Sequence, residues 1–203
     1  SVFGTISGNT SIGNLYDRPI FGSSIDIQGL KMNKELIGNG NLVSVYDSKK
    51  NMVNFTGGLK RDDAGSIKFS GDYTLSKKDS NIVAEAAVND FHLEFFEPFL
   101  KGNLENLKGT ANANLKINGT PDKLLLTGLI KTKVKNVHVN YLGADYNFEG
   151  DIAVEPNSFD FSSLTIYDVN HNHADIVNGK LFHSNFKNFQ LDFDMNIFNF
   201  CFY

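Results

Sequence analysis

The sequence is poor in several residue types that would point to a function. Its 203 residues include no tryptophan, four prolines and one cysteine, Cys201, so neither an internal disulfide framework nor a zinc site made of several cysteines is available. Arginine, whose planar guanidinium suits phosphates and bases, occurs only as Arg18 and Arg61, and the net charge is −4. We therefore expect no electrostatic binding of nucleic acid. No apolar run approaches the roughly 20 residues that span a bilayer, so we expect no transmembrane helix.

What the chain does have is 41% apolar residues, too many for intrinsic disorder, together with 25 asparagines. The apolar residues alternate with polar ones over many short segments, and this period of two is typical of strands with one apolar face. The clearest segment is 189–197, where Gln190, Asp192, Asp194 and Asn196 separate the apolar residues. The apolar members of these segments are the candidates to line one face: Ile67, Phe69, Tyr73, Leu115, Ile117, Val137, Val139, Phe148, Ile152, Val154, Phe189, Leu191, Phe193, Met195 and Ile197.

The segments between these runs contain Gly, Asn, Asp and Pro, as hairpin turns do. The sequence thus predicts an all-β chain of about a dozen mostly antiparallel strands. Glycines lie inside or just before many strands, which favours a strongly curled sheet. A slip in the alternation near Ser162 and Ser163 predicts a β-bulge.

One window departs from the alternation. Over residues 90–101, phenylalanine recurs every four residues, at Phe91, Phe95 and Phe99. Asp90 is a possible N-cap of a helix, and Gly102 is a possible C-terminal end of the same helix. This pattern predicts one short helix, kinked at Pro98, with its aromatic side on the sheet. Whether that helix plugs or caps the apolar face stays open.

The residue types that carry chemistry give weak signals. His171 and His173 lie two residues apart and, on one strand face, would make a weak metal candidate beside Asp168 and Asp175, but a solvated turn explains them better. Asp192 and Asp194 share the solvent face of a strand rather than forming a catalytic pair. We read His183 and Cys201 as structural, and His92 and His138 as surface residues. We expect no catalytic site, metal or cofactor.

An ordered series of short segments resembles the C-terminal part of the TamB family of AsmA-like cell-envelope proteins. The match is dense over 102–203, loose over 1–90, and includes the short helix at 90–101. No single segment is specific to the family, whereas the order of the segments along the chain is. The segments are Tyr46-Asp47, Gly71-Asp72-Tyr73-Thr74-Leu75, Glu97-Pro98-Phe99-Leu100, Leu107-Lys108-Gly109, Ile117-Asn118-Gly119-Thr120-Pro121, Thr127-Gly128-Leu129, Val139-Asn140-Tyr141-Leu142-Gly143, Tyr146, Tyr167-Asp168 and Ala174-Asp175-Ile176-Val177-Asn178-Gly179-Lys180-Leu181-Phe182-His183.

The chain departs from the family after the Tyr167-Asp168 pair. Where such proteins often have a glycine, this chain has Val169, Asn170, His171 and Asn172. Asparagine tolerates the left-handed backbone conformation, so we expect the turn to be kept.

The resemblance implies an elongated, strongly curved sheet that forms an open apolar groove (a β-taco), with residues 1–203 a single section of a longer groove. It also implies a Gram-negative periplasm, an inner-membrane anchor outside this chain, a BamA-like outer-membrane partner, and a role in phospholipid transport or outer-membrane protein assembly. The start at Ser1 and the end at Tyr203 look like cuts in a longer chain.

Two functions follow from these observations. The first is a non-enzymatic groove whose apolar lining shields phospholipid acyl chains. The alternative is a closed β-sandwich or solenoid that binds glycan or protein on its polar face. The two differ in whether the apolar face is open or sealed.

Overall fold

The fold was determined as a computed structural model, and it describes residues 2–16, 19–32, 35–61, 65–75, 80–96, 102, 104–140 and 142–198. The strands are β1 (Val2–Gly13), β2 (Ile20–Met32), β3 (Glu35–Asp47), β4 (Met52–Arg61), β5 (Gly65–Thr74), β6 (Asn81–His92), β7 (Leu104–Glu105), β8 (Lys108–Thr120), β9 (Lys123–Val139), β10 (Ala144–Glu155), β11 (Ser158–Tyr167), β12 (His173–Ser184) and β13 (Lys187–Phe198). A single 3₁₀ turn, η1 (Leu93–Phe96), follows β6.

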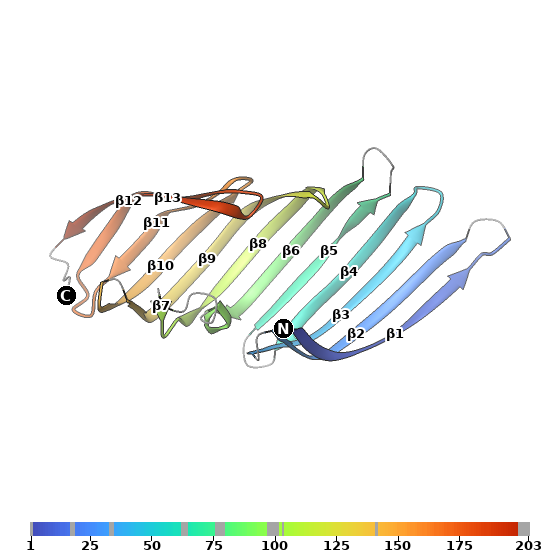
Figure 1. The fold of residues 1–203 in the computed structure, drawn as a ribbon, viewed down its shortest axis with the longest axis horizontal. Coiled ribbons are helices and arrows are strands. Elements are labelled where there is room, and N and C mark those ends of the chain that lie inside the picture. Colours follow the sequence, from blue (N-terminus) through green and yellow to red (C-terminus); the bar gives the residue numbers. More distant parts are fainter. Residues whose placement is uncertain are drawn as a thin grey trace. The chain divides into compact units, whose positions relative to one another are not determined.

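These strands form one open antiparallel sheet in which chain neighbours are mostly sheet neighbours (Figure 1). The order is β1 to β6, then β8 to β13, with the short β7 paired to β9 beside this path. The all-β antiparallel prediction is therefore confirmed. Every described strand belongs to this sheet, so the second sheet that a sandwich requires is not found among the described residues.

Contacts between Cα atoms divide the chain into two compact units. Unit 1 comprises residues 1–89 and 115–126, and unit 2 comprises residues 90–114 and 127–203. Both units contain parts of β6, β8 and β9, because these long strands contribute one end to each.

Among the described residues other than glycine, asparagine supplies most of the left-handed backbone positions. Among the described residues other than glycine, positive φ occurs at Asp90, His171, Phe186 and at six asparagines, namely Asn14, Asn51, Asn106, Asn136, Asn185 and Asn188. The short amide side chain makes local hydrogen bonds that compensate for this conformation. The high asparagine content thus has a local structural cause in turns and bulges.

The helix predicted over residues 90–101 is wrong over its described part. β6 continues to His92, and only one 3₁₀ turn follows it, while residues 97–101 lie outside the described residues. Asp90 is not an N-cap, because its N–H donates to Asn112 Oδ1 at 2.9 Å and its carboxylate accepts from Asn112 Nδ2. The four-residue spacing still has a consequence: the Phe91 and Phe95 rings meet edge to face, 5.7 Å apart.

Glycines on the apolar side of unit 1 make room for neighbouring aromatic rings. Gly57 lies directly opposite Phe69 in the β4–β5 ladder, and the ring covers the glycine. A Cβ at Gly57 would collide with the Asn41 carbonyl oxygen and with the Phe69 ring. The glycine is therefore part of the packing of this face rather than a break in the strand.

We predict that Gly57→Ala lowers the free energy of unfolding by about 1–3 kcal/mol, because both the ring and a backbone oxygen must move. Gly13→Ala is the matched control, since nothing lies within 4 Å of a Cβ there. We expect it to be neutral or slightly stabilising. Urea unfolding followed by far-ultraviolet circular dichroism measures both, and equal stability of the two variants would contradict the packing role.

Candidate functional site

The candidate site of unit 1 is an apolar face built from four parallel rows of side chains. Residues that oppose one another across antiparallel strands share a face, so the registers of β1 to β6 define each row. From β1 to β6, the rows are Ile6, Ile27, Gly40, Leu59, Ile67 and Val88; Gly8, Ile25, Leu42, Gly57, Phe69 and Ala86; Thr10, Ser23, Ser44, Phe55, Gly71 and Ala84; and Ile12, Phe21, Tyr46, Val53, Tyr73 and Ile82.

This face is only partly shielded from solvent. At its β1 side, Ile6 is 71% exposed and Ile12 is 54% exposed, and further across the sheet most side chains are half-buried by their neighbours in the rows. Among the described residues of unit 1, Ala84 is the one apolar side chain that is buried. Unit 1 therefore has an apolar surface rather than a sealed core.

The opposite face of unit 1 is mostly polar. Along β1 it presents Thr5, Ser7, Asn9 and Ser11, and on β4 and β5 Asn54 and Asp72 lie opposite one another and are hydrogen-bonded. From β2 to β6 this face also carries charges of both signs, which are those of Asp26, Asp47, Lys60, Lys68, Asp72 and Glu85. Polar and charged side chains keep this face hydrated.

The registers also settle which members of β3 face which way. Val43 and Val45 alternate as a strand should, yet they lie on the polar face, while Leu42 and Tyr46 lie on the apolar one. Both strand phases of 42–46 carry apolar residues, and the alternation of Val43 with Val45 indicates the wrong one. Ile6 on β1 and Phe21 on β2 also lie on the apolar face, although they are not among the candidates. The same alternation of apolar and polar residues in the sequence marks them.

The candidates for the apolar face all lie in strands whose apolar residues share a face. Ile67, Phe69 and Tyr73 lie in the rows of unit 1, and Leu115 and Ile117 are half-buried in the part of β8 that belongs to unit 1. In unit 2, Val137 opposes Tyr146, and Val139 opposes Ala144. The others there are paired Phe148–Val134, Ile152–Ile130, Val154–Gly128, Leu191–Leu181, Phe193–Gly179, Met195–Ile176 and Ile197–Ala174, with Phe189 next along β13.

Unit 2 differs from unit 1 because part of its apolar face is covered. Leu107, Val134, Val137 and Tyr146 form a buried cluster, and Leu93, Leu104, Leu142 and Phe148 are among the residues packed against it. Leu93 belongs to η1 and Leu104 to β7, so the segment after β6 covers one end of this face. Val137 is 0% exposed and Val154 is 3% exposed. Neither has surface left for a ligand, whereas Leu191 and Phe189 on β13 remain exposed.

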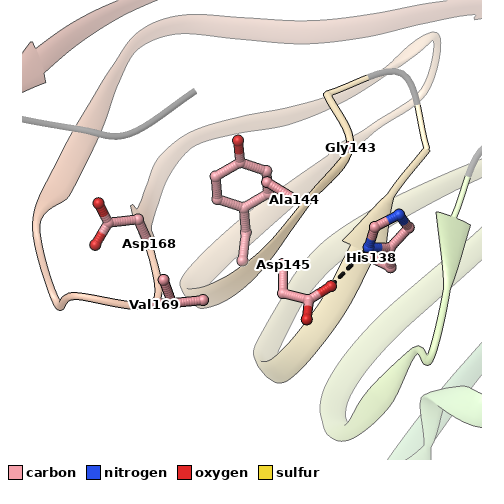
Figure 2. A pocket seen from close by; sticks show the side chains of 7 residues that line it. His138, Gly143, Ala144, Asp145, Asp168 and Val169 are labelled. Carbon is pink, nitrogen blue, oxygen red and sulfur yellow. Dashed lines mark hydrogen bonds and ion pairs between the residues drawn. The ribbon is translucent and has the colours of Figure 1, made fainter. Parts of the chain in front are cut away.

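A small pocket lies beside the buried cluster in unit 2, between the β9–β10 turn and the β11–β12 turn (Figure 2). His138, Asp145 and Tyr146 line one side, and Asp168 and Val169 the other. His138 Nδ1 lies 2.7 Å from Asp145 Oδ1, a cross-strand pair at the surface end of β9 and β10. The pocket holds about 190 Å³, below the usual size of a ligand site.

The Asp168 carboxylate, buried in this pocket, belongs to the turn itself. Its Oδ1 accepts from the N–H groups of Asn170 at 2.8 Å and Asn172 at 2.9 Å, and its Oδ2 accepts from Asn172 Nδ2. The turn after Tyr167 is thus kept, as expected. The left-handed residue, however, is His171, with a φ of 62°, and not an asparagine.

The two weak metal candidates do not share a strand face. His171 lies in the turn, and His173 begins β12, 4.0 Å from the Asp175 carboxylate. Within the described part of the chain, no three His, Cys, Asp or Glu residues lie close enough to hold a metal ion. Cys201 lies outside the described residues. Asp192 and Asp194 are exposed on β13, where Asp192 opposes Lys180.

His183 is buried among aromatic rings. It is 5% exposed, with the Phe186 ring stacked at 4.6 Å and the Phe159 ring at 5.3 Å. Its Nδ1 accepts the Phe186 N–H at 3.2 Å, so the neutral ring carries its proton on Nε2. This contact holds Phe186 at a φ of 59° in the β12–β13 turn, which gives His183 a structural position as expected.

The bulge expected near Ser162 is present and organises a charged cluster on β11 and β12. The β10–β11 register shifts between Asp151 and Ala153. The Ser162 N–H donates to Asp160 Oδ1 at 3.0 Å, and Lys180 Nζ lies 3.0 Å from Asp160 Oδ2. Hydrogen bonds from Ser162 first, and then the Lys180 ammonium, hold the pKa of Asp160 below its ordinary value.

No protein-family model, curated protein or solved structure matches this chain. Among the described residues, no helix has both the length and the apolar character needed to cross a membrane.

We predict that His171→Gly raises the free energy of unfolding by up to about 1 kcal/mol, because glycine adopts positive φ without a Cβ clash. His171→Asn should stabilise less, and His171→Val should destabilise. Urea unfolding of the three variants provides the ranking, and a glycine variant less stable than the parent chain would refute a strained His171.

We predict that Asp160 titrates below the ordinary pKa of an aspartate and that Ser162→Ala and Lys180→Met each raise its pKa, since the Ser162 side chain and the Lys180 ammonium both lower it. Because the folded pKa is depressed, this contribution to stability is present above the unfolded pKa and is lost as pH falls through the folded one. Carboxyl-carbon NMR titration measures the pKa of Asp160 in the parent chain and in both variants. A pKa that Ser162→Ala leaves unchanged would refute the role of the Ser162 side chain.

Proposed function

We propose that this chain is a non-enzymatic cell-envelope protein that shields the acyl chains of phospholipids on its open apolar faces, or that assists the assembly of outer-membrane proteins. The observation that carries the proposal is the apolar face of unit 1. Its four rows run across six strands, and only Ala84 among its described apolar side chains is buried. A surface of this extent is unusual unless an apolar partner covers it.

The chemistry of the two faces suits a lipid ligand. The rows join aliphatic side chains and aromatic rings, with hydroxyl groups at Thr10, Ser23 and Ser44 and without a charged member. An acyl chain gains about 0.8 kcal/mol for each methylene group that it buries against the apolar members. The opposite face stays hydrated through Ser, Thr and Asn. Headgroups would remain in water beyond the ends of the rows, and the mechanism requires no catalytic residue.

The biological setting comes from the resemblance to the TamB family. It supports a place in the periplasm of a Gram-negative bacterium, between the inner and outer membranes, within a longer protein anchored in the inner membrane. A BamA-like outer-membrane protein would be the partner. These parts of the proposal depend on the ordered segments rather than on the fold.

The polar face supports a second candidate, recognition of glycan or protein. Thr5, Ser7, Asn9 and Ser11 form a row of hydrogen-bonding groups along β1 without a charge. This alternative requires no ligand on the apolar face, so the two candidates respond to different substitutions.

Native mass spectrometry of the purified chain tests the first candidate, with phospholipid adducts as the expected result. Ile25→Asp places a carboxylate in the middle of the apolar rows, and Ser24→Asp places the same group on the polar face of the same strand. We predict that Ile25→Asp reduces lipid occupancy at least about tenfold, because a carboxylate against acyl chains is poorly solvated. Ser24→Asp should leave occupancy unchanged.

Circular dichroism and urea unfolding verify that both variants fold. A lipid-free parent chain that also excludes apolar dyes would reject the shielding function. Loss of glycan or protein binding in Ser24→Asp, with Ile25→Asp unaffected, would favour the polar face.

A further inference from the structure

The β1–β2 hairpin of unit 1 ends in a group of exposed apolar side chains. Leu15 and Tyr16 occupy the turn and are 63% and 104% exposed, and Ile12, Ile20 and Phe21 beside them are exposed as well. Ile12 opposes Phe21, and Gly13 opposes Ile20, so these residues surround the tip from both strands. The hairpin is the blue end of the ribbon in Figure 1.

This group, which we call the hairpin tip, continues into the apolar rows. Ile12 and Phe21 belong to the row that proceeds through Tyr46, and the Phe21 and Tyr46 rings lie 6.1 Å apart. Residues 2–16 and 19–25 contain no charged side chain. The described residues of the tip therefore offer apolar surface without a charged side chain.

Cationic side chains lie at the same edge of unit 1. Ile20 opposes Asp47 in the β2–β3 ladder, so the β3–β4 turn is the neighbour of the hairpin tip. In that turn the N–H groups of Lys49 and Lys50 donate to Asp47 Oδ1 at 2.9 and 3.3 Å, and both lysines are exposed. A group of aliphatic and aromatic side chains next to two ammonium groups suits a bilayer surface, where acyl chains lie below anionic phosphates.

We propose that the hairpin tip docks this chain onto a phospholipid bilayer, with Leu15 and Tyr16 entering the interface and Lys49 and Lys50 contacting phosphate groups. A convex turn with exposed Leu, Tyr, Ile and Phe enters the headgroup region as interfacial segments do. The inference is independent of lipid carriage on the apolar rows, because docking requires only the tip and its neighbouring turn.

The absence of tryptophan from the chain makes a single reporter possible. Tyr16→Trp should show a blue-shifted emission on addition of phosphatidylcholine vesicles that contain a minor fraction of phosphatidylglycerol. Val169→Trp is the control reporter, since Val169 is an exposed apolar residue in a turn of unit 2. Its emission should not change.

Vesicle flotation of the full chain measures the affinity. The double variant Leu15→Ser with Tyr16→Ser should bind at least about tenfold more weakly to both lipid compositions. The matched control, Val43→Ser with Val45→Ser, removes two exposed apolar side chains from the polar face of β3 and should bind as the parent does. Lys49→Gln with Lys50→Gln should lose about tenfold on the anionic vesicles and little on phosphatidylcholine alone.

Several results would overturn the proposal. They are no binding of the parent chain to either vesicle, equal blue shifts of the two reporters, or full binding by the Leu15 and Tyr16 double variant. Binding that depends on the two lysines but not on Leu15 and Tyr16 would indicate electrostatic adsorption and would also overturn it. Ile25→Asp should dock normally, so failure of lipid shielding and failure of docking are distinguishable.

Discussion

The antiparallel ladder of unit 1 is the constraint on which the rest of its properties depend. Side chains alternate between the faces of a strand, so one register error would move a whole set of side chains to the wrong face. From β3 to β6 the pairing advances residue by residue without a shift. The apolar phase of each strand therefore meets the apolar phase of the next, and a continuous face results from alternation and register together.

Unit 2 uses the same ladder with interruptions, and the interruptions build its buried cluster. At Asn136 the β9–β10 register gains one residue on β9, and the Asn136 N–H donates to Asn147 Oδ1. The chain on either side of this bulge supplies Val134 and Val137, which pack with Tyr146 and Leu107. A bulge bends the strand and increases its twist. Bulges and the segment after β6 together close one end of a face that would otherwise resemble that of unit 1.

The sequence predicted the strands and the apolar face well where one phase of the alternation is strictly polar, as around Phe69 and Phe193. The alternation of Val43 with Val45 indicated the wrong phase, because both phases of that strand are apolar and only pairing with β2 and β4 selects one. The helix expected at residue 90 was wrong because a spacing of four also arises where a strand with a left-handed residue at Asp90 continues into a 3₁₀ turn. The left-handed residue after Asp168 was missed because the Asp168 carboxylate determines the turn geometry, and His171 must follow it.

The exposure of the apolar rows in unit 1 raises the question of how the face avoids aggregation. Glycines reduce the apolar area: Gly8, Gly40, Gly57 and Gly71 each stand in a row where a larger residue would add exposed surface. Phe69 covers Gly57, so the ring lies along the sheet and buries part of its own surface. At Gly8, Gly57 and Gly71 a Cβ would collide with a backbone carbonyl oxygen, so the close pairing of the strands excludes a larger side chain at these positions.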